Sequence, residues 1–405
     1  MKYDYLILGA GPAGLTIANL IKKNKPSASF LVLEKESVPG GLCRSENVDG
    51  SPLDIGGGHF LDVRRPKVNE FLFSFMPEEE WNIYDRDSRI DMGSYVVGHP
   101  FEANIWQMPQ DEQVKYLKSI AVAGCNLGTE KPVKFIEWIT WKLGEKIAQD
   151  YMLPYNGKMF GGELDKLGTY WLDKLPDVSF DDTLLSCLNR KPYGKQPGHA
   201  RFYYPKKYGY GELWIRMGKA LGDSLICNCY VKSLNITEKT VTASDGSSYC
   251  AETIITTIPW KCFETIDGCD KEIPGLISGL MHTGTEIRYI PENLDTNAHW
   301  IYVPDKDISY HRILVRHNFC EGSRGYWLET NMNRVSLGKN REDSVAFPNE
   351  YTYPLNTIDK PERMSKLLPY MRSHGIIGLG RWGEHEHYNS DRTVERAMEL
   401  FEEIR

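Results

Sequence analysis

Hydrophobic positions near the start of the chain predict a strand, a tight turn and a helix. The apolar run 5–8 leads into a turn with the spacing G-x-G-x-x-G, made by Gly9, Gly11 and Gly14, and apolar residues then recur at helical intervals. A second short apolar run ends at the acidic Glu34. Strand, glycine turn, helix and strand in this order are typical of a βαβ unit.

The three glycines and Glu34 have the properties that a dinucleotide site requires. Gly9 permits the tight turn, Gly11 lets backbone N–H groups approach a pyrophosphate, and Gly14 lets the helix lie close to the strand. The helix N-terminus favours the anion, and the Glu34 carboxylate can accept hydrogen bonds from an adenosine ribose. Because an acid here disfavours a phosphorylated ribose, we expect a cofactor other than NADP.

A second glycine-rich segment follows six residues after Glu34. Gly40 and Gly41 would let a loop fold across a flat ligand, and Arg44 offers a forked, permanently charged guanidinium for phosphate. The segment resembles the second glycine motif of the flavoprotein superfamily that includes amine oxidases, protoporphyrinogen oxidase and UDP-galactopyranose mutase. This resemblance favours FAD over NAD; a plain surface turn is the alternative.

The middle of the chain alternates between helical and strand-like spacing. Residues 66–76 and several stretches within 111–190 show helical spacing, whereas 225–260 shows short alternating runs with a hairpin turn at Asp245-Gly246. The apolar run 253–259 is predicted to be a buried strand that returns to the nucleotide-binding sheet.

The remaining segments complete the predicted fold. Alternating runs within 285–335 indicate a separate antiparallel sheet, and a short strand at 375–381 with a helix at about 392–404 is expected beside the first segment. We therefore expect an α/β protein with a Rossmann-like FAD-binding domain built from both chain ends, a helical insertion and an antiparallel β-sheet domain. The expected boundaries are 1–75, 205–265 and 370–405 for the FAD-binding domain, 76–204 for the mainly helical insertion that binds the substrate and its nucleotide, and 266–369 for the substrate-contacting sheet.

Composition narrows the function classes. The 405 residues suffice for two or three domains, 41% of them are hydrophobic, and the net charge of −7 argues against nucleic acid or an anionic membrane as a partner. No apolar run approaches membrane-spanning length, and the first strand begins too close to Met1 for a signal peptide. We therefore expect a cytoplasmic protein, in which the nine scattered cysteines are reduced.

Five short motifs, in order along the chain, resemble those of the UDP-galactopyranose mutase family. Gly57-Gly58-His59 is similar to the motif whose histidine loop lies over the flavin ring. The other four are similar to Y-P-F-Q-N-N-I at 99–105, P-Y-N-x-K at 154–158, W-L-Y-F-P followed by F-Y-R at 300–304 and 310–312, and G-R-L-x-E-Y-K-Y-Y-D-M-D at 380–391.

This resemblance implies an enzyme that interconverts pyranose and furanose forms of a nucleotide-activated sugar. Reduced flavin N5 would attack the anomeric carbon of UDP-galactopyranose or a related nucleotide sugar, and a flavin–sugar adduct would open and reclose its ring. The implied cofactor is reduced FAD, so an external reductant is an expected partner. Any interface between copies would lie on ordinary amphipathic helix faces, so homo-oligomerisation stays open.

The chemistry requires cations beside the departing diphosphate, because negative charge grows there. Arg312 is the first candidate, with Tyr302 as a hydroxyl donor and His59 as a flavin-facing residue; an arginine in a surface strand salt bridge is the alternative. Expected cofactor contacts are Gly9, Gly11, Gly14, Glu34, Gly41, Arg44, Gly58, Val231, Gly380, Arg381 and Asp391. Expected substrate contacts are Tyr155, Asn156, Trp171, Lys174, Tyr353, His385, His387 and Tyr388, although Tyr155 and Trp171 can equally be helical core aromatics.

Three departures from the family pattern concern the substrate. His385 and His387 stand where bacterial members have diphosphate-binding tyrosines, Lys174 stands where a second phosphate arginine is expected, and Glu102 replaces a glutamine. Two histidines two residues apart on a strand would also face one side, as a metal site needs, but no further ligand is evident, so no metal is expected.

Two rival functions remain. A flavin oxidase or desaturase on the same scaffold would need an apolar tunnel, against which the polar candidates count. A non-catalytic nucleotide-sugar binder is the other. No P-loop, metalloprotease helix or G-x-S-x-G elbow is present in the sequence, which argues against kinase-like and hydrolase functions.

Overall fold

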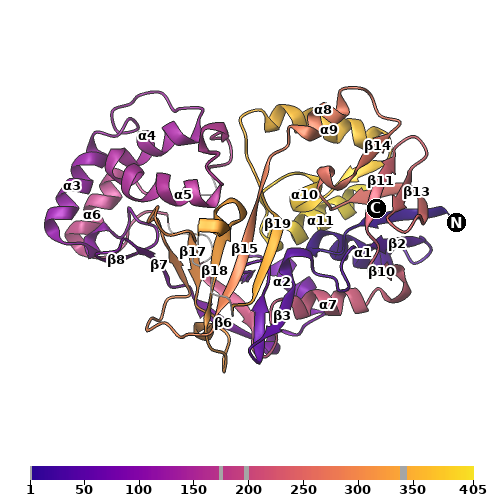
Figure 1. Cartoon of the computed structure of the whole chain (residues 1–405), viewed down its shortest axis with the longest axis horizontal. Coiled ribbons are helices and arrows are strands. Elements are labelled where there is room, and N and C mark those ends of the chain that lie inside the picture. The colour runs from indigo at the N-terminus through magenta and orange to yellow at the C-terminus, as the bar shows by residue number, and fades with distance from the viewer. Residues whose placement is uncertain (1, 173–176, 196–199, 338–343) are drawn as a thin grey trace.

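A largely parallel sheet with helices on both faces forms one side of the molecule (Figure 1). The computed structural model describes residues 2–172, 177–195, 200–337 and 344–405. In spatial order the strands are β10 (Leu225–Ile226), β2 (Phe30–Leu33), β1 (Lys2–Leu8), β13 (Ser248–Thr256), β12 (Thr240–Ala243), β11 (Val231–Asn235) and β14 (Thr265–Asp267), with β20 (Ile376–Gly378) beside the end of β13.

The pairing of β1 confirms the predicted βαβ unit. β1 runs parallel to β2 on one side and to β13 on the other, and β13 runs parallel to β20. The predicted strand at 253–259 therefore returns to the nucleotide-binding sheet, and the hairpin at Asp245-Gly246 joins β12 to β13.

Side-chain alternation along β1 fills two cores. Ile7 faces α1 (Pro12–Asn24), α7 (Gly211–Lys219) and α11 (Ser390–Ile404), whereas Leu6 and Leu8 face α8 (Ile273–Ser278) and α9 (Lys360–Ser373). Strands buried on both faces are expected for a parallel sheet covered by helices.

The two ends of the chain meet through helices. α11 packs along α1, as predicted for the last segment, but β20 lies next to β13 and not next to β1. The reason is that β1 already pairs on both edges, with β2 and β13, so the last strand takes the free edge at the end of β13.

The opposite side of the molecule is helical (Figure 1). It contains α3 (Gln110–Ala121), α4 (Phe135–Ile147), α5 (Leu153–Met159) and α6 (Phe180–Asn189), with a π-helical turn at Ala148–Met152 between α4 and α5. Four strands also fall within 76–204: β6 (Trp81–Asp85), β7 (Ser88–Asp91), β8 (Val96–Gly98) and β9 (Arg201–Pro205). The domain boundaries drawn from the sequence therefore stay a proposal.

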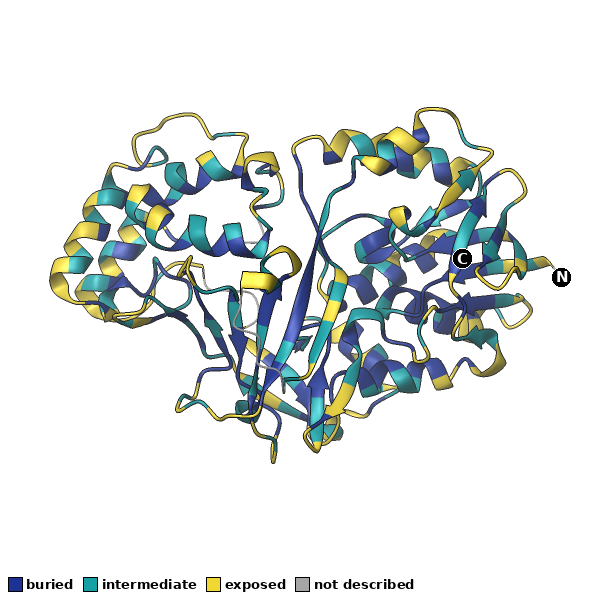
Figure 2. Cartoon of the chain, in the orientation of Figure 1, coloured by how far each residue is buried: buried dark blue, intermediate teal, exposed yellow. Residues whose placement is uncertain are grey.

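A second sheet lies between these two parts, and it confirms the predicted antiparallel sheet. Its order is β19 (Ala346–Pro354), β15 (His282–Ile290), β18 (Tyr326–Asn331), β17 (Arg312–Leu314), β16 (Trp300–Tyr302), β7 and β8, antiparallel except where β16 meets β7. Buried residues concentrate along both sheets, and exposed residues cover the outer helix faces (Figure 2).

Short elements connect the large sheets. β3 (Ser45–Val48) and β4 (Ser51–Asp54) form a hairpin. β5 (Leu61–Asp62) pairs with β9, and β9 pairs on its other edge with β6. α2 (Pro66–Phe73) confirms the predicted helix, and α10 (Gly380–Gly383) follows β20. Over the residues that are described, no helix is long and apolar enough to cross a bilayer.

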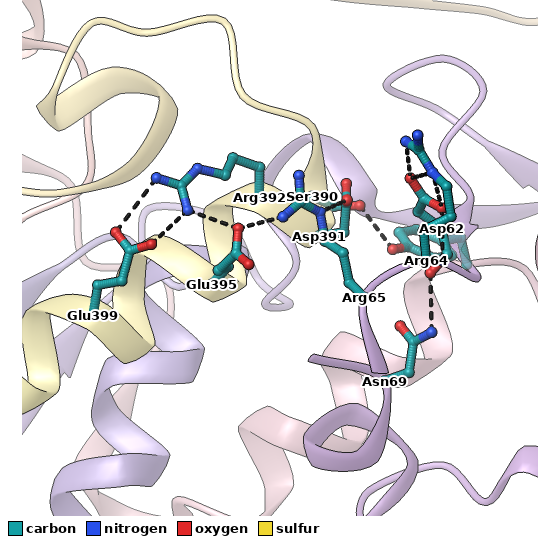
Figure 3. Close-up of polar contacts among 10 residues, drawn as sticks. Asp62, Arg64, Arg65, Asn69, Ser390, Asp391, Arg392, Glu395 and Glu399 are labelled. Atoms are coloured by element: carbon teal, nitrogen blue, oxygen red, sulfur yellow. Dashed lines mark hydrogen bonds and ion pairs between the residues drawn. The ribbon is translucent and has the colours of Figure 1, made fainter. Parts of the chain in front are cut away.

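A polar network fixes the start of α11 (Figure 3). Arg65, which precedes α2, pairs with the buried Asp391 and with Glu395, and Arg392 pairs with Glu395 and Glu399. The Ser390 hydroxyl lies 2.8 Å from the Tyr210 hydroxyl. The first turn of α11 is thus held against the loop between β5 and α2.

Candidate functional site

The glycine turn after β1 has the geometry that the sequence predicts. Gly9 adopts φ +95°, and a Cβ on Gly14 would lie 1.9 Å from the Gly9 carbonyl oxygen, so helix α1 approaches the turn as closely as backbone allows. A Cβ on Gly11 would meet only the Cα of Gly41, at 3.9 Å. The two glycine motifs therefore lie almost in backbone contact at Gly11 and Gly41, and both border a space that side chains leave open.

This space is the first cavity, with a volume of about 270 Å³. It is bordered by the ends of β1, β2 and β13, the start of α1 and the second glycine motif. The predicted residues that line it are Gly9, Gly11, Glu34, Gly41, Arg44, His59, Val231, Arg381 and Tyr388.

Glu34 is buried at the edge of this cavity. Its Oε2 accepts a hydrogen bond from the Ala10 N–H at 2.7 Å, and its Oε1 accepts one from the Glu36 N–H at 3.0 Å. Burial raises the pKa of this carboxyl, although both amide hydrogen bonds act against the rise. Since each carboxylate oxygen has a second lone pair, Glu34 can still accept a hydrogen bond from a ribose hydroxyl.

Arg44 is held beside the same cavity. Its Nε donates to the Gly41 carbonyl at 3.0 Å, and its guanidinium pairs with Glu36 at 3.1 Å. The side chain is mostly buried, so these contacts hold the guanidinium in one position beside the cavity.

A second cavity of about 210 Å³ adjoins the first, and His59, Arg381 and Ser390 line both. Its walls come from the loop 56–60, from the antiparallel sheet and from the segment after α10. The predicted residues that line it are Gly58, His59, Arg312, Tyr353, Arg381 and His387.

Arg312 both lines the second cavity and forms a buried ion pair. Its Nε donates to Glu329 Oε2 at 2.7 Å, and its NH2 group donates to the Tyr353 hydroxyl at 3.2 Å. Burial alone would lower the pKa of Arg312, but Glu329 raises it well above the ordinary value. The guanidinium is therefore a fixed cation with one carboxylate partner.

Arg381 is a partly buried cation at the wall that the cavities share. It donates to the Tyr388 carbonyl at 2.9 and 2.6 Å and to the Thr352 carbonyl at 2.9 Å. Burial lowers its pKa. No carboxylate within the described ranges lies at ion-pair distance from it.

His59 reaches both cavities as a neutral ring. Burial, reinforced by the charge of Arg381, lowers its pKa to about 3. Its Nδ1 lies 2.9 Å from the Gly57 carbonyl, which fits a neutral imidazole that donates from Nδ1.

Several predicted site residues line neither cavity. Tyr155 packs its ring against Tyr302 at 5.3 Å, and Trp171 packs against Phe135 at 5.3 Å while its Nε1 donates to the Gly168 carbonyl. Asn156 donates to the Met152 carbonyl. Within the described structure, Gly14, Tyr302, Gly380, His385 and Asp391 also stay outside both linings, and Lys174 lies outside the described residues.

The strand expected at 385–387 is wrong. The segment is a turn after α10, and His385 adopts φ +51°. His385 Nε2 contacts the Met281 carbonyl at 2.9 Å, whereas the His387 ring lies 4.9 Å from that of Tyr353 in the second cavity. The two rings diverge, and no cluster of three metal-ligating side chains occurs in the described part of the chain.

Comparisons with known proteins agree with this architecture. An NAD(P)-binding Rossmann-like domain model matches residues 7–75. A crystal structure of reduced UDP-galactopyranose mutase superposes over 100% of this chain and 95% of that one, with a TM-score of 0.89 at 21% sequence identity. The chain has the UDP-galactopyranose mutase fold.

The mutase fold is shared with several oxidases. A putative protoporphyrinogen oxidase from Exiguobacterium sp. 255-15 matches with a TM-score of 0.72 and 12% identity, and cyclohexylamine oxidase from Brevibacterium oxydans IH-35A with 0.67 and 14%. The first match covers 100% of this chain and 99% of the oxidase, and the second covers 100% of both. The chain therefore shares its fold with these oxidases as well as with the mutase.

A curated relative matches part of the chain in sequence. An uncharacterized protein in the nifH2 3′ region of Methanothermococcus thermolithotrophicus is 49% identical over 51 residues, which are 13% of this chain. The match spans 47% of that relative, about half its length.

Sequence reasoning missed two charged residues, Arg86 on the wall of the second cavity and Glu329, which pairs with Arg312 beside it. Arg86 lines the cavity from a short charged stretch, Asp85 to Asp87, that looks like an ordinary surface turn. Glu329 is buried on β18 on the same face as Trp327. An acid on an apolar strand face was a signal that could have been found, whereas nothing in the sequence marks Arg86.

Proposed function

We propose that this protein is a flavin-dependent mutase of the UDP-galactopyranose mutase family, and that it interconverts pyranose and furanose forms of a nucleotide-activated sugar. One observation carries the proposal. A cavity of about 270 Å³ on a Rossmann-like unit shares the wall residues His59, Arg381 and Ser390 with a second cavity that three arginines line. A flavin in the first cavity could meet an anionic substrate in the second.

The residues of the first cavity fit FAD. Gly11 and Gly41 leave room for a pyrophosphate at the start of α1, where backbone N–H groups and the helix dipole favour an anion. Glu34 is placed for a ribose hydroxyl and Arg44 for a phosphate. When bound and reduced, FAD supplies the nucleophile N5, so an external electron donor is part of the proposal.

The side chains of the second cavity have two tasks in this reaction. Arg312 neutralises charge on the departing diphosphate, and Glu329 fixes its guanidinium so that little reorganisation is needed. The Tyr353 hydroxyl, which accepts from Arg312, can direct its own proton to the same anion. His59 stays neutral at physiological pH, so it adds no charge beside the flavin site.

The oxidase fold matches make a flavin oxidase the second candidate. The three cavity arginines disfavour an amine oxidase, because a cationic amine substrate would add positive charge to a cavity that arginines already line.

The experiment is an assay under reducing, anaerobic conditions. The flavin-loaded protein is reduced with dithionite, mixed with a panel of nucleotide sugars, and the products are separated by chromatography. Furanose products are expected. Oxygen consumption with an amine or a porphyrinogen and no isomer would instead identify an oxidase, and spectral shifts without product would identify a binder.

Arg312→Ala tests the role of the cation. Turnover is expected to fall by about a hundredfold or more while flavin content stays unchanged. Arg312→Lys keeps a charge beside Glu329 but loses the planar fork, so it separates lost catalysis from damage to the buried pair. Arg89→Ala is the matched control, because Arg89 pairs with Asp87, both side chains are about one-third exposed, and Arg89 lines neither cavity. Loss of flavin in Arg312→Ala would place Arg312 in the cofactor site.

A further inference from the structure

Four side chains form a row across neighbouring strands of the antiparallel sheet. Glu329 on β18 lies opposite Arg312 on β17, and Arg312 lies opposite Tyr302 on β16. Directly opposed residues share one face of an antiparallel pair, so these three side chains lie side by side. The Tyr302 hydroxyl then accepts a hydrogen bond from the Arg86 guanidinium at 2.7 Å. The order is carboxylate, guanidinium, phenol, guanidinium.

Arg86 is held in this row by uncharged partners. Its Nε donates to the Ser88 hydroxyl at 2.6 Å, and its guanidinium lies 4.7 Å from the Trp300 ring. Stacking on an aromatic face fixes the plane of the guanidinium without neutralising its charge. Among the residues that are described, no carboxylate pairs with Arg86.

The charge of the second cavity is therefore unbalanced. Of the three arginines that line it, Arg312 is compensated by Glu329, whereas Arg86 and Arg381 are bound only by hydroxyl or carbonyl oxygens. Cations removed from water cost free energy unless a ligand or a side chain pairs with them. Two such cations in one cavity match a ligand that carries two negative charges.

We propose that Arg86 is a second anion-binding residue, which contacts the diphosphate of the substrate in the second cavity together with Arg312, while Arg381 adds a further uncompensated positive charge to the same cavity. This inference rests on the proposed function for the identity of the substrate, but the recognition of a diphosphate rests on the cavity alone. Tyr302 lines neither cavity, so its hydroxyl oxygen, which accepts a hydrogen bond from Arg86, positions that guanidinium and does not itself contact the anion. Arg86 thus takes the part that Lys174 was expected to play.

The test measures binding of inorganic pyrophosphate and of UDP to the flavin-loaded, oxidised protein by calorimetry at several salt concentrations. Arg86→Met removes the charge but keeps an unbranched side chain that can lie on Trp300. Its affinity for pyrophosphate is expected to fall by about tenfold or more, the size of one charged hydrogen bond, and its salt dependence should flatten.

Arg89→Met is the matched control. Arg89 lies three residues along the chain, pairs with Asp87 and does not line the cavity, so its affinity for pyrophosphate should stay within about twofold of wild type. Arg86→Lys keeps the charge without the fork and should lie between wild type and Arg86→Met. If Arg86→Met does not fold, the test rests on Arg86→Lys. This variant should lose affinity for pyrophosphate while its flavin content stays unchanged.

The outcomes separate this inference from the proposed function. Unchanged pyrophosphate affinity in the Arg86 variants, or no pyrophosphate binding by the wild type, would overturn the role of Arg86. If Arg86→Met loses pyrophosphate binding and the wild type isomerises no nucleotide sugar, the role of Arg86 stands and the mutase proposal falls. If the wild type isomerises a nucleotide sugar and Arg86→Met does so with the same KM, the mutase proposal stands and the role of Arg86 falls.

Discussion

The two cavities differ in which parts of the chain form their walls. The first is formed largely by main chain: glycines, strand ends and the start of α1 border it. The second is formed by side chains from segments far apart in sequence, with Arg86, Arg312 and Arg381 on its walls. A site made of backbone tolerates little change in shape, whereas a site made of side chains can change its ligand while the fold persists.

The largest expected effect concerns the first cavity. In Gly14→Ala the new methyl group would lie 1.9 Å from the Gly9 carbonyl oxygen, so α1 must move away from β1. We expect a destabilisation of about 3 kcal/mol or more, measured by denaturant unfolding, together with loss of bound flavin.

Gly11→Ala sharpens this comparison. Its methyl group would meet nothing closer than the Gly41 Cα at 3.9 Å, so the midpoint of unfolding should change little. Flavin content should still fall, because the methyl group enters the space between the glycine motifs. If Gly11→Ala and Gly14→Ala lost equal amounts of stability, that result would contradict the difference in space around these two glycines.

The next effect concerns α11, whose first residue borders both cavities. Arg65→Met removes the partner of Asp391, which is 1% exposed, and an unpaired buried carboxylate costs about 3 kcal/mol. Because Ser390 lines both cavities, flavin binding and pyrophosphate binding should weaken together.

Arg392→Met is the control within the same network. Arg392 and its partners Glu395 and Glu399 are each at least one-third exposed, so the free energy of unfolding should change by about 1 kcal/mol at most. If Arg65→Met weakened the binding of only flavin or only pyrophosphate, that result would contradict a shared dependence of both cavities on α11.

A pH titration distinguishes His385 from its neighbour in the second cavity. Burial, with help from Lys360, lowers the pKa of folded His385 to about 3, against an ordinary value near 6.5. Between these values the unfolded chain binds the extra proton, so stability falls as pH falls from about 6.5 to 3, by up to about 1.4 kcal/mol per pH unit.

His385→Asn should make that acid slope shallower by about one proton, as measured by unfolding at several pH values. His387→Asn should instead alter pyrophosphate affinity, since His387 lines the cavity. An acid slope unaffected by His385→Asn would contradict the buried, neutral assignment.

The smallest effect is expected from His387→Tyr. A tyrosine hydroxyl reaches further than imidazole and donates to anions, so affinity for UDP should rise by a few-fold, about 1 kcal/mol or less. Flavin content and stability should stay unchanged. A large loss of either would mean that this wall of the second cavity has a structural role.

The difference between the cavities also explains what the sequence could predict. Gly9, Gly11, Gly14 and Glu34 lie within one local βαβ pattern, and their spacing alone predicts how the backbone turns. The alternating runs likewise predicted the antiparallel sheet, because apolar and polar residues alternate along each of its strands.

The second cavity depends on strand pairing, which local spacing does not encode. Arg86 reaches Tyr302 only because β7 joins β16, a parallel pairing between segments more than two hundred residues apart. Tyr155 and Trp171 were assigned by motif, yet their rings pack on neighbouring aromatics and line neither cavity. Strand register and side-chain direction, not residue type, decide which of these groups can meet a ligand.

The shared wall has a consequence for the order of events during synthesis. Arg381 and Ser390 border both cavities, and α11 packs along α1 of the unit that β1 opens, yet the ribosome makes these residues after nearly all others of the two walls. A nascent chain that has emerged only as far as the antiparallel sheet lacks one side of each pocket. Under the proposed function, cofactor loading therefore has to wait until translation has passed the segment that begins at β20.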